Sequence, residues 1–261
     1  MHVVEGRLEL CLNCLTTPAA AAVDLLQKMD CVTMVLVERG TGLPLDLVVL
    51  INSFFLYEKL TDENLQQAIA LWFRNEEECK WRFGHISFWN TSRVTNMGGA
   101  FFHRRSFNED ISRWDVRRVT VMSWMFDGAS HFNQDIGRWD VSQVTKMSHM
   151  FNEASQFNQD IGRWDVSNVT DMSYMFFEAS QFNQDIGQWD VSNIVSMRSM
   201  FAEASQFNQD IGQWNVSHVR DMREMFSGAS QFNQDISRWN VSNTTKRIFM
   251  FDRATSYRGI R

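Results

Sequence analysis

Large apolar residues return every 25 positions over most of the chain. Polar residues separate them within each unit in the order FNQDIGxWDVSxVTxMxxMFxxASQ. The most regular column consists of tryptophans, which are Trp89, Trp114, Trp139, Trp164, Trp189, Trp214 and Trp239. Phenylalanine and isoleucine keep the same period at Phe107, Phe132, Phe157, Phe182, Phe207 and Phe232 and at Ile111, Ile136, Ile161, Ile186, Ile211 and Ile236. A fixed period of this length is the signature of stacked structural repeats, and we expect one unit used about seven times.

The methionine-rich part of each unit has helical spacing. In one copy the positions i, i+3, i+4 and i+7 are Met172, Met175, Phe176 and Ala179, which would share one face of a helix. Thr170 stands where an N-cap residue would accept from the first free amides. The pattern predicts a helix of about two turns in every unit.

The following part of the unit does not suit a helix. Gly187 disfavours one, and Trp189 and Val191 alternate with the polar Asp190. We therefore expect a short strand near residues 185–189 that pairs with the equivalent strand of the next coil at about 4.8 Å. The predicted fold class is an α/β repeat with one short strand and one short helix per coil.

The methionine, aspartate and asparagine columns each have a structural explanation. The methionines lie at helix-face spacing beside phenylalanine and are expected to fill gaps in the core. The aspartate column (Asp110, Asp135, Asp160, Asp185, Asp210 and Asp235) is expected to accept backbone hydrogen bonds in a turn, with calcium shared between coils as the alternative. The asparagine column (Asn133, Asn158, Asn183 and Asn208) predicts an amide ladder along the stack.

Charge and cysteine content narrow the functional classes. A net charge of -6 leaves no basic surplus for phosphate contacts, which argues against nucleic acid as a partner. All four cysteines precede the repeats, which favours a reducing compartment. Cys11 and Cys14 form a CxxC pair, but no second pair stands at zinc-ligand spacing. We therefore expect ordinary thiols and no metal or other cofactor.

The segment before the repeats is divided into two parts. Residues 1–40 give no structural indication, and residues 41–81 are expected to form a helical cap whose last helix spans residues 60–72. The N-terminus lacks the pattern of a signal peptide, and residues 43–57 are too short to span a bilayer. These features favour a soluble protein of the cytoplasm or another intracellular compartment. A surface or secreted location is the alternative, because sequons that would accept glycans occur at Asn90, Asn168, Asn215, Asn240 and Asn243.

The unit, seen in WDVSNVTDMSYMF followed by EASQFNQDIG, resembles the BspA-like tandem repeats, a divergent branch of the leucine-rich-repeat family. The resemblance covers residues 82–257. It implies a right-handed solenoid of leucine-rich-repeat type and a role in adhesion or protein binding, and it implies no catalytic residue.

A shorter segment, LPLDLVVLINSFF at residues 43–55, is similar to the opening of an F-box. Leu43, Pro44, Leu47, Ile51 and Phe54 stand in the matching positions. This similarity implies a substrate receptor of a ubiquitin ligase in which the repeats would hold the substrate. Any leucine-rich amphipathic helix that begins at a proline is the alternative explanation.

Candidate binding residues lie in the columns that vary between copies, because varied positions in a stack face outward. The first column contains Lys146, Asp171 and Asp221, and the second contains Trp124, His149, Tyr174 and Glu224. A third column, with Arg113, Arg138 and Arg163 in register, would suit an acidic or sulfated ligand. No catalytic constellation recurs in the sequence. We therefore expect a non-enzymatic scaffold that binds a protein partner whose identity, like the oligomeric state, the sequence leaves open.

Overall fold

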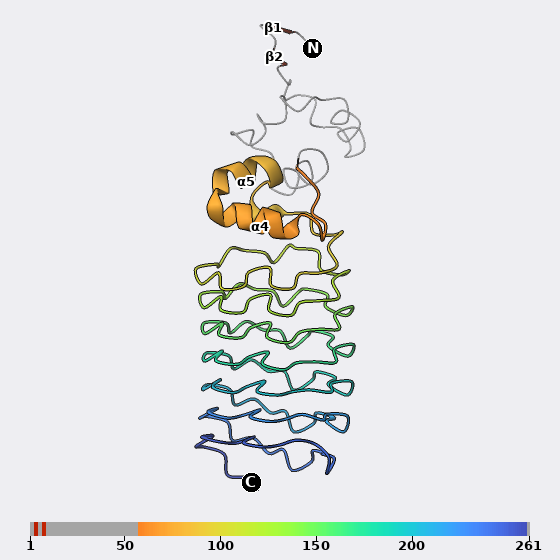
Figure 1. The fold of residues 1–261 in the computed structure, drawn as a ribbon, viewed down its shortest axis with the longest axis vertical. Coiled ribbons are helices and arrows are strands. Elements are labelled where there is room, and N and C mark those ends of the chain that lie inside the picture. Colours follow the sequence, from red (N-terminus) through yellow and green to blue (C-terminus); the bar gives the residue numbers. More distant parts are fainter. Residues whose placement is uncertain (1–2, 5–6, 9–56, 260–261) are drawn as a thin grey trace, which may run out of the picture.

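The computed structural model describes residues 3–4, 7–8 and 57–259. The strands β1 (Val3–Val4) and β2 (Arg7–Leu8) pair antiparallel, with Val3 opposite Leu8. The helices α4 (Leu65–Arg74) and α5 (Glu76–Phe83) precede a 3-10 turn, η2 (Ile86–Phe88). From η2 onward, residues 86–257 wind into a pile of similar coils below α4 and α5, which we call the coil stack (Figure 1).

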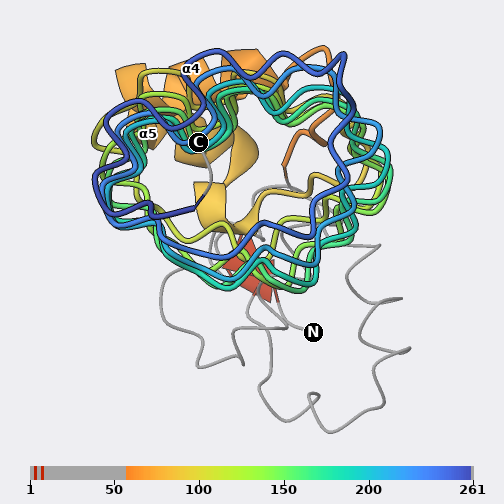
Figure 2. The same ribbon diagram turned by 90° about the horizontal axis from the view of Figure 1, so that it is seen from below.

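The interior of the coil stack is filled by columns of side chains in which each residue packs on its equivalent in the next coil. Seen along the stack, the coils superpose as a closed oval (Figure 2). The rings of Phe151 and Phe176 stack with centroids 5.6 Å apart, and Phe176 and Phe201 repeat that step. The methionines of the predicted helix face, such as Met172 and Met175, are fully buried. The prediction that methionine packs the core is confirmed.

The predicted strand and helix in each coil are wrong. Within residues 86–257 the chain forms turns and isolated parallel bridges, and η2 is the only helical element there. The bridges join Asn96, Val121, Lys146, Asp171, Ser196, Asp221 and Lys246 in succession, whereas residues 185–189 form a turn. The fold is therefore not an α/β solenoid of leucine-rich-repeat type.

Left-handed backbone conformations explain why the helical spacing does not produce a helix. In each coil two residues four positions apart, such as Tyr174 and Glu178, have φ angles of 58° and 56°, which a right-handed helix excludes. The amides alternate in direction: Tyr174 N–H donates to the carbonyl of Arg198 in the next coil, and Met175 N–H donates to Met172. The i, i+3, i+4, i+7 pattern places the same side chains inward, but in a flattened turn. Thr170 Oγ1 donates to the Thr145 carbonyl of the preceding coil and is not an N-cap.

The opposite part of each coil, residues 132–145 and their equivalents, is called the constant side because its residue types repeat almost unchanged. Here side chains connect the coils. Trp164 Nε1 donates to the Ile136 carbonyl at 3.2 Å, and Asn158 Oδ1 accepts from Asn183 N–H at 2.9 Å. The predicted asparagine ladder is confirmed. The aspartates accept from the backbone two residues later, as Asp185 does from Gly187, so the expected backbone hydrogen bonding is confirmed as well.

The first coil has no coil before it, and the α4 segment makes the hydrogen bonds that a preceding coil would otherwise make. Asp62 Oδ1 accepts from Thr95 N–H at 2.7 Å, where later coils use a threonine carbonyl, as Thr145 N–H donating to Thr120 shows. Gln66 Nε2 donates to the Gly98 carbonyl at 3.0 Å. Trp72 packs edge-on against Trp89, the first rung of the tryptophan column. The helix expected over residues 60–72 is present as α4, and it closes one end of the core.

Several expectations concern residues that the structure leaves undescribed. The F-box-like segment at 43–55 and the Cys11–Cys14 pair both lie outside the described residues. The thiol of Cys79 is buried between α4 and α5, where it donates to the Ala68 carbonyl. Across residues 3–4, 7–8 and 57–259, no helix has the length and apolar character needed to cross a membrane.

Candidate interaction face

Two columns of left-handed residues form the most varied side of the coil stack. The Trp124 column consists of Gly99, Trp124, His149, Tyr174, Ser199, Glu224 and Phe249. The Glu178 column consists of His103, Gly128, Glu153, Glu178, Glu203, Gly228 and Arg253. We call the outward positions of residues 121–128 and their equivalents in the other coils the interaction face. The backbone of this face is held by N–H groups that donate to the next coil at every second residue, for example at Trp124 and Phe126.

The first half of the Trp124 column is a stack of rings. Trp124 and His149 have centroids 5.5 Å apart, and His149 and Tyr174 have centroids 4.6 Å apart. The Arg198 guanidinium lies 5.6 Å from the centroid of the Tyr174 ring. Gly99 precedes Trp124 in the column, so no side chain of the equivalent position covers the other face of the indole. Trp124 is 46% exposed.

Burial shifts the pKa of two groups on this face. Burial lowers the pKa of His149, and the carboxylates of Asp127 and Asp171 only partly oppose this effect. His149 Nδ1 is buried without a hydrogen-bond partner in the described part of the chain. Burial also raises the pKa of Asp127. The neutral imidazole therefore behaves as a stacking element between Trp124 and Tyr174.

The bridge column lies beside the rings and contains the candidate residues Lys146, Asp171 and Asp221. Lys146 is exposed, whereas the two aspartates are half-buried and pair within their own coils. Asp171 accepts from the Ser173 hydroxyl at 2.6 Å, and Asp221 accepts from Arg223 Nη2 at 2.5 Å. The Arg223 guanidinium lowers the pKa of Asp221. Of these three candidates, Lys146 is the most available to a partner.

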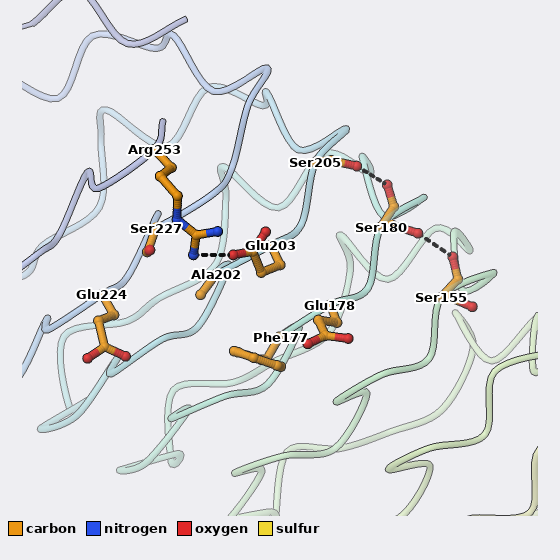
Figure 3. Close-up of a pocket in the computed structure, with 10 residues that line it drawn as sticks. All are labelled: Ser155, Phe177, Glu178, Ser180, Ala202, Glu203, Ser205, Glu224, Ser227 and Arg253. Carbon is orange, nitrogen blue, oxygen red and sulfur yellow. Dashed lines mark hydrogen bonds and ion pairs between the residues drawn. The ribbon is translucent and has the colours of Figure 1, made fainter. Parts of the chain in front are cut away.

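The second half of the face contains an acidic groove of about 630 Å³. The carboxylates of Glu178, Glu203 and Glu224 lie around it, with Phe177 and Ala202 as apolar lining (Figure 3). Burial raises the pKa of Glu178, and the like charges of Glu153 and Glu203 raise it further. The predicted candidate Glu224 also accepts from the Ser199 hydroxyl at 3.2 Å.

Sequence reasoning missed most of this groove. Glu153, Glu178 and Glu203 recur with the 25-residue period, so the alignment of copies contained the signal. Gly228 and Arg253 continue the same column at the same period, but the sequence does not show that the Arg253 side chain reaches Glu203.

The arginine column lies half a coil away, on the constant side. Arg113, Arg138 and Arg163 are exposed and in register, and the positive charge of Arg113 contributes to lowering the pKa of Asp110. The structure therefore does not bring this column together with the Trp124 column. Across the described residues, no group of three or more His, Cys, Asp or Glu side chains is arranged to hold a metal ion.

Comparison with known proteins gives one result. A family model described as "Mycoplasma protein of unknown function, DUF285" matches residues 67–186 and again residues 158–260. Two overlapping matches of one model are consistent with a tandem repeat. Searches of the curated proteins and of the solved structures find no match to the chain.

Proposed function

We propose that this chain, which belongs to the DUF285 family of Mycoplasma proteins of unknown function, is a non-enzymatic scaffold that binds a protein partner through its interaction face. The observation that supports this proposal most directly is the ring stack of Trp124, His149 and Tyr174. An indole that is 46% exposed leaves apolar area in water that partner binding would remove. Tryptophan and tyrosine are the residue types that most often anchor protein interfaces.

The backbone beneath the rings adds a second argument. Trp124 N–H donates to the Ser148 carbonyl at 3.0 Å, and His149 N–H donates to the Ser173 carbonyl at 2.9 Å. These bonds hold the backbone beneath the rings, and the rings stack on one another; preorganised anchors lose little conformational entropy on binding. The columns differ between coils in charge and size, which provides a distinct pattern along the stack. A scaffold that recognises a specific protein surface needs both features.

The proposal is tested by affinity capture with two matched double variants. Trp124→Ala with Tyr174→Ala removes the two ends of the ring stack. We expect the amount of each captured partner to fall at least tenfold relative to the native chain. Arg138→Ala with Arg163→Ala removes two exposed side chains on the constant side and is the control. Circular dichroism and the unfolding midpoint check that both variants fold.

The outcome separates the alternatives. Retention of partners by the ring variant and their loss by the arginine variant would contradict the proposal and favour an acidic ligand, whose affinity would fall steeply with salt. Recovery of ubiquitin-ligase adaptors that survives both double variants would place binding in residues 43–55. Equal retention by all three proteins would exclude this face as the binding surface.

A further inference from the structure

Near its end the Glu178 column contains a glycine, Gly228, in place of a glutamate. Gly228 follows Glu203 in the column, and a Cβ atom at Gly228 would lie only 2.4 Å from Glu203 Oε2. The Glu203 carboxylate therefore occupies the space that a side chain at position 228 would fill. In this position the carboxylate contacts Arg253, two coils away along the chain, whose Nη2 donates to Glu203 Oε1 at 2.5 Å (Figure 3).

This ion pair shows that the groove accepts a guanidinium. The Arg253 side chain remains 65% exposed while it contacts Glu203, so water competes for the contact and it is readily broken. Within the described residues, the Glu178 carboxylate has no cation beside it. The Glu178 side chain is exposed, and partial desolvation together with the like charges of Glu153 and Glu203 raises its pKa.

The lining of the groove offers further complementary groups. Ser227 is 7% exposed, lines the groove, and its hydroxyl has no hydrogen-bond partner among the residues described. Phe177 and Ala202 provide apolar surface between the carboxylates. An arginine side chain combines a three-carbon stem that packs on such surface with five donors for carboxylate and hydroxyl oxygens.

We propose that this groove binds the guanidinium of an arginine side chain presented by a partner protein, with Glu178 and Glu203 as its carboxylate partners and Arg253 as the internal group that it displaces. The proposal rests on the scaffold function above and specifies the chemistry of the partner at one place on the interaction face. Ser227 accepts a further N–H, and Phe177 contacts the methylene stem. A planar guanidinium pairs with carboxylates through two parallel hydrogen bonds, which a lysine ammonium cannot do.

The test uses the full chain and the blocked tripeptide acetyl-Gly-Arg-Gly-amide, observed through the backbone amide signals of Glu178, Glu203 and Ser227 in NMR titrations. The control peptide contains citrulline, which keeps the shape of arginine without its charge. We expect saturable shifts with arginine and at least tenfold weaker binding of citrulline. Glu178→Gln should weaken arginine binding at least fivefold, and Arg253→Gln should strengthen it about threefold because the internal competitor is gone.

Glu109→Gln is the matched control variant, since it removes an acidic charge on the constant side at a position where the other coils have glutamine. It should leave the affinity unchanged. Equal shifts with citrulline, unchanged affinity after Glu178→Gln, or weaker binding after Arg253→Gln would each overturn the proposal. Equal binding of spermidine with the same dependence on Glu178 would show a general site for polyamines and overturn the assignment to arginine.

The peptide titration does not involve the ring stack. Suppose that the arginine peptide does not bind, but the Trp124 and Tyr174 double variant loses its partners. This result would overturn the present inference and leave the scaffold function standing. If the arginine peptide binds and the double variant keeps its partners, the scaffold function of the ring stack is overturned and arginine binding in the groove stands.

Discussion

The constant side and the interaction face of each coil hold neighbouring coils together with different atoms. On the constant side, side chains make the contacts: Asn158 Oδ1 accepts from the next coil and Trp164 Nε1 donates to the preceding one. On the interaction face, backbone amides such as that of Tyr174 donate directly to the carbonyls of the next coil. Because any residue except proline provides a backbone N–H, outward side chains on the interaction face are free to differ between copies.

The same comparison explains where binding chemistry can arise. Replacement of the asparagine or tryptophan on the constant side breaks a bond between coils, and replacement of the aspartate breaks a bond within its own turn, so the repeat keeps these residues in place. Replacement of Trp124 or Glu178 leaves the coil-to-coil bonds unchanged. The interaction face can therefore present rings at one end and carboxylates at the other on one continuous backbone.

The largest expected effect separates two tryptophans. Trp164→Ala on the constant side removes a buried indole and its bond to the Ile136 carbonyl, and should lower the free energy of unfolding by about 3–5 kcal/mol. Trp124→Ala on the interaction face should lower it by about 1 kcal/mol or less, because the indole is half exposed. Urea denaturation followed by circular dichroism measures both. Equal losses would remove the distinction between the two sides.

A smaller effect is expected from the asparagine ladder. Asn158→Ala removes the acceptor for Asn183 N–H and for Gln184 Nε2, each at 2.9 Å, and should cost about 1–2 kcal/mol. Asn158→Asp keeps an oxygen in the same place and should cost less at neutral pH. The unfolding midpoints of the two variants provide the test. An alanine variant as stable as the aspartate variant would show that the ladder does not hold the coils.

The smallest effect tests the left-handed backbone of the interaction face. Glu153 is exposed and has a φ of 55°, a conformation that costs a residue with a Cβ atom about 1–2 kcal/mol. Glu153→Gly should therefore be more stable than Glu153→Ala by about 1 kcal/mol. In a right-handed helix the order would be reversed, with glycine about 1 kcal/mol worse than alanine. Thermal unfolding of the pair decides between the two backbones.

Part of this fold follows from sequence alone. The 25-residue period specifies the number and order of the coils, and it identifies the Trp, Phe, Met and Asn columns as the interior and the ladders. It also shows that the Trp124 column varies between copies, although Ser199 within it is buried. These results depend only on which positions repeat, which the sequence states directly.

The tertiary structure decided the path of the backbone and the contents of the groove. Helical spacing indicates which side chains point inward, but it does not specify the backbone. A turn with two left-handed residues buries Met172, Met175, Phe176 and Ala179 just as a helix would. The bonds to the next coil stabilise that turn, and they are not local in sequence. The contact between Glu203 and Arg253 likewise spans 50 residues and depends on the absent side chain of Gly228. Only the stacking of coils brings a carboxylate, an empty position and a guanidinium into one place.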